Sequence, residues 1–119
     1  MSDSALRTKS KEYAKQIVFL CRKMRRSGVE GVLTNQLLRC GTSVGANIHE
    51  AQYAQGTKDF ISKFEIALKE CNESMYWLEL LFETNSISDT DFDVLTKACV
   101  DIRRMLVSSV TTLKQKELK

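Results

Sequence analysis

The sequence contains no proline and only five glycines among its 119 residues. β-Sandwiches and barrels need many turns and usually build them from these two residues, so the composition argues against both folds. The sequence also has no apolar run near the roughly 18 residues that a membrane span needs, and its first residues, Met1 to Ser4, are polar. We therefore expect neither membrane insertion nor an export signal.

Histidine occurs once, as His49, and this scarcity bears on metal chemistry. A di-iron site in a helix bundle needs Glu-x-x-His pairs on facing helices, which one histidine cannot supply. The four cysteines, Cys21, Cys40, Cys71 and Cys99, form no C-x-x-C pair and so lack the usual zinc spacing. Each lies on or beside an apolar stripe, so we interpret them as buried free thiols in a reducing, cytoplasmic setting. We predict no metal and no cofactor.

The segment from Gly41 to Gly45 matches the G-x-S-x-G pattern of a hydrolase nucleophile elbow. That motif requires a strand before the serine, a helix after it and a distant histidine. Here the pattern lies within a helical periodicity, and His49 is only six residues from Ser43 on the same predicted helix. A serine hydrolase is therefore excluded, and we predict that the protein is not an enzyme.

Apolar residues recur along the whole chain with the i, i+3, i+4, i+7 spacing of amphipathic helices. The predicted helices span about residues 4–26, 31–54, 58–84 and 89–114. Connections of roughly three to five residues make sequential helices antiparallel. The sequence therefore predicts an all-α protein, one domain over residues 1–119, folded as an antiparallel up-down-up-down four-helix bundle.

The ends of these helices carry recognisable signals. A glycine is available between the first two helices for a left-handed terminal residue. Thr57 is expected to cap the third helix, and the run from Ser88 to Asp91 resembles a capping box for the fourth. Residues 115–119 have no cap, so we expect them to fray.

Charge is distributed unevenly although the net charge is only +3. Residues 1–26 hold eight Lys or Arg against two acids, whereas residues 59–93 hold nine acids against two lysines. Six basic side chains of the first helix fall within an arc of about 100°. They are Arg7, Lys11, Lys15, Arg22, Arg25 and Arg26. A row of cations can match phosphate spacing, so we predict nucleic-acid binding here, with a solvated bundle face as the alternative.

The second helix carries a polar stripe and two glycines. The stripe consists of Gln36, Arg39, Ser43, Asn47 and Glu50. We expect Arg39 to form an ordered network with Glu50, Ser43 and Asn47 near a subunit interface, with a partner-binding groove as the rival interpretation. Gly41 and Gly45 each cost helix stability, so a close helix approach is expected. The glycine side is predicted to face a neighbouring subunit, and tight packing within the monomer is the alternative.

The segment from Gln36 to Ala51 resembles a family signature of the form Q-L-x-R-(small)-x-x-S-(I/V)-x-x-N-I-x-E-(G/A). The segment from Phe60 to Glu70, followed by Trp77-Leu78, is similar to the same family's third helix. The family is that of bacterial four-helix bundles that includes the 23S ribosomal RNA intervening-sequence proteins and the accessory proteins of diversity-generating retroelements. The resemblance covers about residues 10–110.

This resemblance implies a homo-oligomeric ring, a pentamer, with a basic, nucleic-acid-facing role and no catalysis. It implies a structural role, at or near subunit contacts, for the polar positions of the second helix. The retroelement proteins tend to be more strongly basic than this chain, so a structured RNA is the better expected partner.

Two other functions stay open at this point. One is a protein-interaction scaffold, in which a ring presents an acidic surface around Glu73, Glu79, Glu83 and residues 89–93 to a basic partner. The other is a small helical nuclease, which the lack of a metal cluster disfavours.

Overall fold

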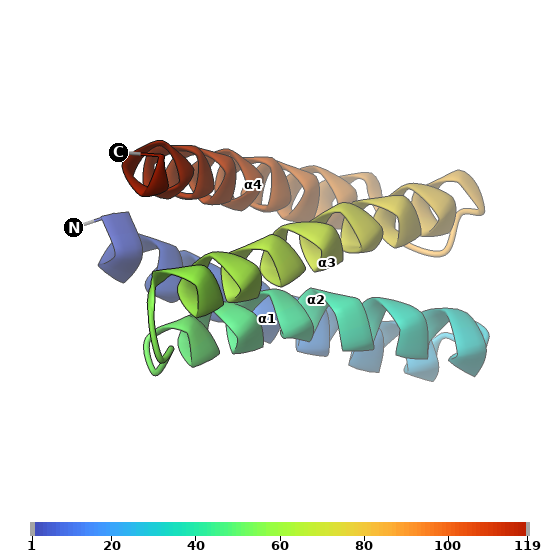
Figure 1. Ribbon diagram of the computed structural model, residues 1–119. Coiled ribbons are helices and arrows are strands. Elements are labelled where there is room, and N and C mark those ends of the chain that lie inside the picture. Colours follow the sequence, from blue (N-terminus) through green and yellow to red (C-terminus); the bar gives the residue numbers. More distant parts are fainter. Residues whose placement is uncertain (1, 119) are drawn as a thin grey trace.

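The protein is a bundle of four antiparallel helices, which the computed structural model describes for residues 2–118, with side chains from Ser4 onward. The helices are α1 (Ser2–Arg26), α2 (Gly31–Ala51), α3 (Thr57–Glu83) and α4 (Asp89–Glu117). Each helix packs against the next one in the chain, and α1 also packs against α4. Figure 1 shows the elongated bundle, about 52 × 22 × 20 Å, with both termini at one end. The predicted fold is confirmed, and residues 2–118 contain no strand.

The apolar stripes form one continuous core along the bundle axis. Leu6, Ile17 and Met24 of α1 are at most 1% exposed, and Phe64 of α3 and Leu106 of α4 are fully buried. Burying each such side chain contributes roughly 1.5–3 kcal/mol of transfer free energy. The helical spacing of apolar residues in the sequence predicts most of this core.

Two helices end in a residue with left-handed backbone conformation. Gly28 follows α1 with φ of 82°, and the next amide donates to the Met24 carbonyl at 3.0 Å. Asn85 follows α3 with φ of 60°, and the Ser86 amide donates to the Leu81 carbonyl at 2.8 Å. These bonds satisfy carbonyls that the helix ends leave free, so both turns are fixed. The glycine after the first helix was predicted, whereas the asparagine was not.

The starts and ends of other helices correct some expectations. Ser88 caps α4 as predicted, because its hydroxyl accepts the Asp91 amide at 3.1 Å. Thr57 is not a cap but the first residue of α3, and the Asp59 carboxylate instead accepts the Gln55 amide at 3.1 Å.

Two helix ends also differ from the predicted bounds. α2 ends at Ala51 rather than residue 54, because the following amides turn back to carbonyls three residues earlier. Residues 115–117 were expected to fray but continue α4, and the Leu118 amide donates to the Lys114 carbonyl. Lys119 lies outside the described residues.

All four cysteines are free and buried, as the sequence predicted. Burial raises the pKa of Cys21 to about 11 and that of Cys40 to about 12. At ordinary pH, these two thiols are therefore neutral. Cys71 and Cys99 meet where α3 packs on α4, with 3.1 Å between their sulfur atoms.

Candidate functional site: the basic face of α1

The six basic residues singled out in α1 are all exposed and lie on one side of the helix. Two other lysines of α1 turn toward α4 instead. Lys9 pairs with Asp101 at 2.9 Å, and Lys23 pairs with Asp91 at 2.6 Å. Asp91 and Asp101 of α4 are thus engaged by these two lysines. The other six cations stay exposed, and among the described residues only Lys15 of these six has a salt-bridge partner.

A groove of about 790 Å³ runs between α1 and α2 beside this face. Arg7, Lys11 and Lys15 line it from α1, and His49 lines it from α2. Among the described residues, Glu12 is the one acid in its lining, and it pairs with Lys15 at 3.6 Å. The groove therefore presents an excess of positive charge in a concave surface, which suits an anionic ligand.

The remaining cations lie nearer the C-terminal end of α1. Arg25 donates to the Asn35 amide oxygen at 2.7 Å, which ties this end of the face to α2. The Arg22 guanidinium lies over the Phe19 ring, 6.0 Å from its centroid. Phe19 is 60% exposed and was not identified from the sequence. Its position four residues after Lys15 and three before Arg22 was the available signal.

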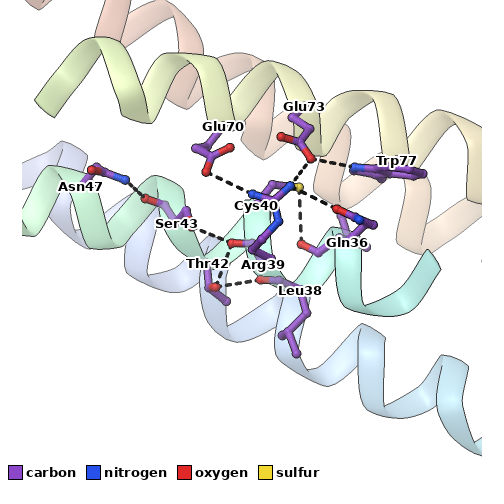
Figure 2. A network of polar contacts seen from close by, with 11 residues as sticks. Gln36, Leu38, Arg39, Cys40, Thr42, Ser43, Asn47, Glu70, Glu73 and Trp77 are labelled. Carbon is purple, nitrogen blue, oxygen red and sulfur yellow. Dashed lines mark hydrogen bonds and ion pairs between the residues drawn. The ribbon is translucent and has the colours of Figure 1, made fainter. Parts of the chain in front are cut away.

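The polar stripe of α2 is organised around Arg39, as Figure 2 shows. The Arg39 guanidinium crosses to α3, where it pairs with Glu70 at 3.4 Å and with Glu73. It also donates to the Gln36 side chain at 3.2 Å. Glu73 accepts the Trp77 indole N–H at 3.1 Å, and this bond together with Arg39 lowers the pKa of Glu73. The result is a clamp between α2 and α3 on the bundle surface.

The expected partners of Arg39 on its own helix are wrong. Ser43 donates to the Arg39 backbone carbonyl at 2.7 Å, and Asn47 donates to the Ser43 carbonyl at 2.9 Å. These are bonds to the helix backbone and do not involve the guanidinium. Glu50 is exposed and forms no salt bridge within residues 4–118. Helical spacing put these residues on one face, but the acids that Arg39 selects come from α3.

The two glycines of α2 face α1 of the same chain. A Cβ at Gly41 would lie 2.9 Å from the Ile17 side chain, and one at Gly45 would lie 3.2 Å from the Ser10 carbonyl oxygen. The close helix approach that the spacing predicts is confirmed. The prediction that these glycines face a neighbouring subunit is wrong, because α1 already fills that space.

Part of the predicted acidic surface is engaged within the bundle. Glu73 pairs with Arg39 and Asp91 pairs with Lys23. The other acids of this surface, among them Glu79, Glu83 and Asp93, remain exposed. Among the described side chains, no three His, Cys, Asp or Glu residues gather as metal ligands. None of the described helices carries an apolar stretch of membrane-spanning length.

Comparison with known proteins agrees with this geometry. The family model of the 23S rRNA-intervening sequence protein matches residues 2–108. A solved structure from Bacteroides thetaiotaomicron VPI-5482, of a protein with unknown function from the S23 ribosomal protein family, superposes with a TM-score of 0.90. It is 42% identical, and the match covers 93% of this chain and 99% of that one. No curated protein matches significantly. Because the family model spans nearly the whole bundle, the chain belongs to the 23S rRNA-intervening sequence protein family.

Proposed function

We propose that this protein is a non-enzymatic, homo-oligomeric RNA-binding bundle of the cytoplasm that contacts RNA through the basic face of α1. The observation that carries the proposal is the division of cations on α1. Lys9 and Lys23 pair with Asp101 and Asp91 of α4, and six exposed cations remain on the other side of the helix. The family's description as an rRNA-intervening sequence protein supports RNA over other polyanions.

The mechanism is contact between phosphates and lysine or arginine side chains. Such contacts release counterions, and they depend on salt more than on base sequence. In RNA they recognise the shape of a structured segment through its backbone. One face of a small bundle offers few contacts, so a ring of copies, a pentamer in this proposal, would bind more tightly by engaging several segments at once.

The polar side of α2 is proposed to lie at or near the contact between copies. Gln36 and Arg39 are held in place by the clamp to α3, so their positions are fixed before any association. Val32, near the start of α2, and Tyr53, just after its end, are each 74% exposed. Exposed apolar side chains flanking an ordered polar surface favour contact with another protein surface.

Charge reversal tests the RNA-binding face directly. The triple variant Arg22→Glu, Arg25→Glu, Arg26→Glu should lose binding to an RNA hairpin in fluorescence anisotropy, while circular dichroism shows intact helices. The matched control is Lys58→Glu, Lys69→Glu, Lys97→Glu, which makes the same change in net charge at exposed positions outside α1.

The control variant should keep most of the affinity, because the contacts are local to α1. An equal loss of RNA affinity in both variants would mean that only the net charge matters. Unchanged affinity in the triple arginine variant would refute the assignment of RNA binding to the α1 face. If neither variant nor the wild-type protein binds RNA, the exposed acids Glu79, Glu83 and Asp93 make a protein scaffold the better reading.

A further inference from the structure

Phe19 is a large aromatic side chain that the bundle core does not use. Its ring is 60% exposed on the outer side of α1. A single exposed apolar residue is ordinary on a protein surface, so its surroundings decide its meaning. Here the helical neighbours of Phe19 at i−4, i+3 and i+4 are Lys15, Arg22 and Lys23, all of them basic.

An exposed aromatic ring such as that of Phe19 can stack with a flat, polarisable partner. Arg22 already lies over it, with the guanidinium carbon 6.0 Å from the ring centroid. Guanidinium groups and nucleobases are both planar and use the same kind of contact with an aromatic face. A base that stacks on Phe19 would have the cationic groups of Lys15 and Arg22 beside its flanking phosphates.

The groove described above adjoins the N-terminal part of the same row of cations and is not lined by Phe19 or Arg22. It lies between α1 and α2, which are packed in direct contact, and its walls are single helices. Arg7 and Lys11 in this groove extend the row of cations from Lys15 toward the N-terminal end of α1.

We propose that the α1 face recognises unpaired nucleotides, with one base stacked on Phe19 and the neighbouring phosphates held by Lys15 and Arg22. This rests on the proposed RNA-binding function and names the part of the RNA that the face selects. Bases within a duplex stack on one another and offer no free face to a side chain, whereas loop nucleotides do. The protein therefore binds the loop of a hairpin in preference to its stem.

The test compares one RNA strand alone with the same strand annealed to its complement. Full-length wild-type protein, Phe19→Ala and Phe19→Trp are titrated against both probes in low salt by anisotropy. Removing one stacking contact should weaken binding of the unpaired strand roughly 5- to 100-fold. Binding of the duplex should change little, and Phe19→Trp should restore the affinity for the unpaired strand.

Tyr76→Ala is the matched control, because Tyr76 is 57% exposed on α3, away from the basic face. It should leave both affinities unchanged. Equal affinity of wild-type protein and Phe19→Ala for the unpaired strand would overturn the stacking site, while RNA binding through α1 would stand. A lower molar mass of Phe19→Ala in light scattering would assign the ring to a contact between copies, and would overturn it as well. Binding of neither probe by wild-type protein would refute both this inference and the proposed function.

Discussion

At the residue scale, the two glycines of α2 show how close packing is encoded. Gly41 approaches the side chain of Ile17, which has some freedom to move, whereas Gly45 approaches the backbone of Ser10, which has little. A helix pays about 1 kcal/mol for each glycine relative to alanine. This cost is offset because α1 and α2 come close enough to bury the apolar Ile17 side chain against Gly41.

Gly45→Leu should therefore destabilise the monomer itself by about 1–3 kcal/mol, because the added side chain meets backbone that cannot yield. Urea unfolding followed by circular dichroism measures the change. Gly31→Ala is the control, since nothing lies within 4 Å of a Cβ there, and it should be neutral or slightly stabilising. A folded Gly45→Leu variant of unchanged stability would contradict the packing described.

The buried thiols predict how stability depends on alkaline pH. Cysteine in an unfolded chain ionises near pH 8.5, whereas burial raises the pKa of Cys21 to about 11 and of Cys40 to about 12. Each thiol's contribution is complete below the unfolded pKa and is lost as pH rises toward the folded one. Burial also raises the pKa of Tyr13, which acts in the same direction.

The free energy of unfolding should thus fall as the pH rises from about 8.5, where the unfolded thiols ionise, toward the folded pKa values of about 11 for Cys21 and about 12 for Cys40. The double variant Cys21→Ala, Cys40→Ala should be less stable at pH 7 but show a smaller fall over this range. Urea titrations at several pH values measure both effects. An identical pH dependence in the two proteins would contradict the assignment of the fall to these thiols.

At the element scale, the helices were predictable and their mutual contacts were not. Periodicity fixed which residues of each helix face inward, and Ser88 was recognisable as a cap because its chemistry is local. The partners of Arg39 were not recoverable, since Glu70 and Glu73 lie more than thirty positions away on α3. The helix opposite Gly45 was equally hidden, because spacing identifies a close approach without identifying the neighbour.

The candidate site, too, was only partly predictable from the sequence. The six cations of α1 were found because they share a helix and an arc. That Lys9 and Lys23 are neutralised by α4, and that His49 faces the groove, depended on the arrangement of the helices. Phe19 was missed because an aromatic residue in a helix is usually counted toward the core.

The clamp between α2 and α3 leads to a prediction about the stability of the bundle. Arg39→Ala should lower the free energy of unfolding only modestly, because half of the Arg39 side chain is exposed to solvent, which weakens its ion pairs. Salt should reduce the difference from wild type, since screening weakens exposed ion pairs. Lys15→Ala is the control, because its only pair is the exposed one with Glu12 among the described residues, and it should change stability very little. Equal effects of the two variants, each measured by urea unfolding, would contradict a special role for the clamp.

At the scale of the whole molecule, function follows from where charge remains after the bundle has formed. The net charge of +3 is small, yet the acids of α3 and α4 are partly consumed by Arg39, Lys9, Lys23 and Lys114. The six exposed cations of α1 lie together on one side of that helix. In the proposed oligomer, an elongated bundle with one basic side would present that side repeatedly, which would raise its affinity for a polyanion.

The most direct test of this account is the salt dependence of RNA binding by the wild-type protein. A structured RNA hairpin is titrated by fluorescence anisotropy from low to physiological salt, and light scattering on the same sample gives the number of copies. The account predicts an oligomer whose affinity falls steeply and linearly on a logarithmic scale as salt rises. A monomer that does not bind the hairpin even at low salt would contradict it.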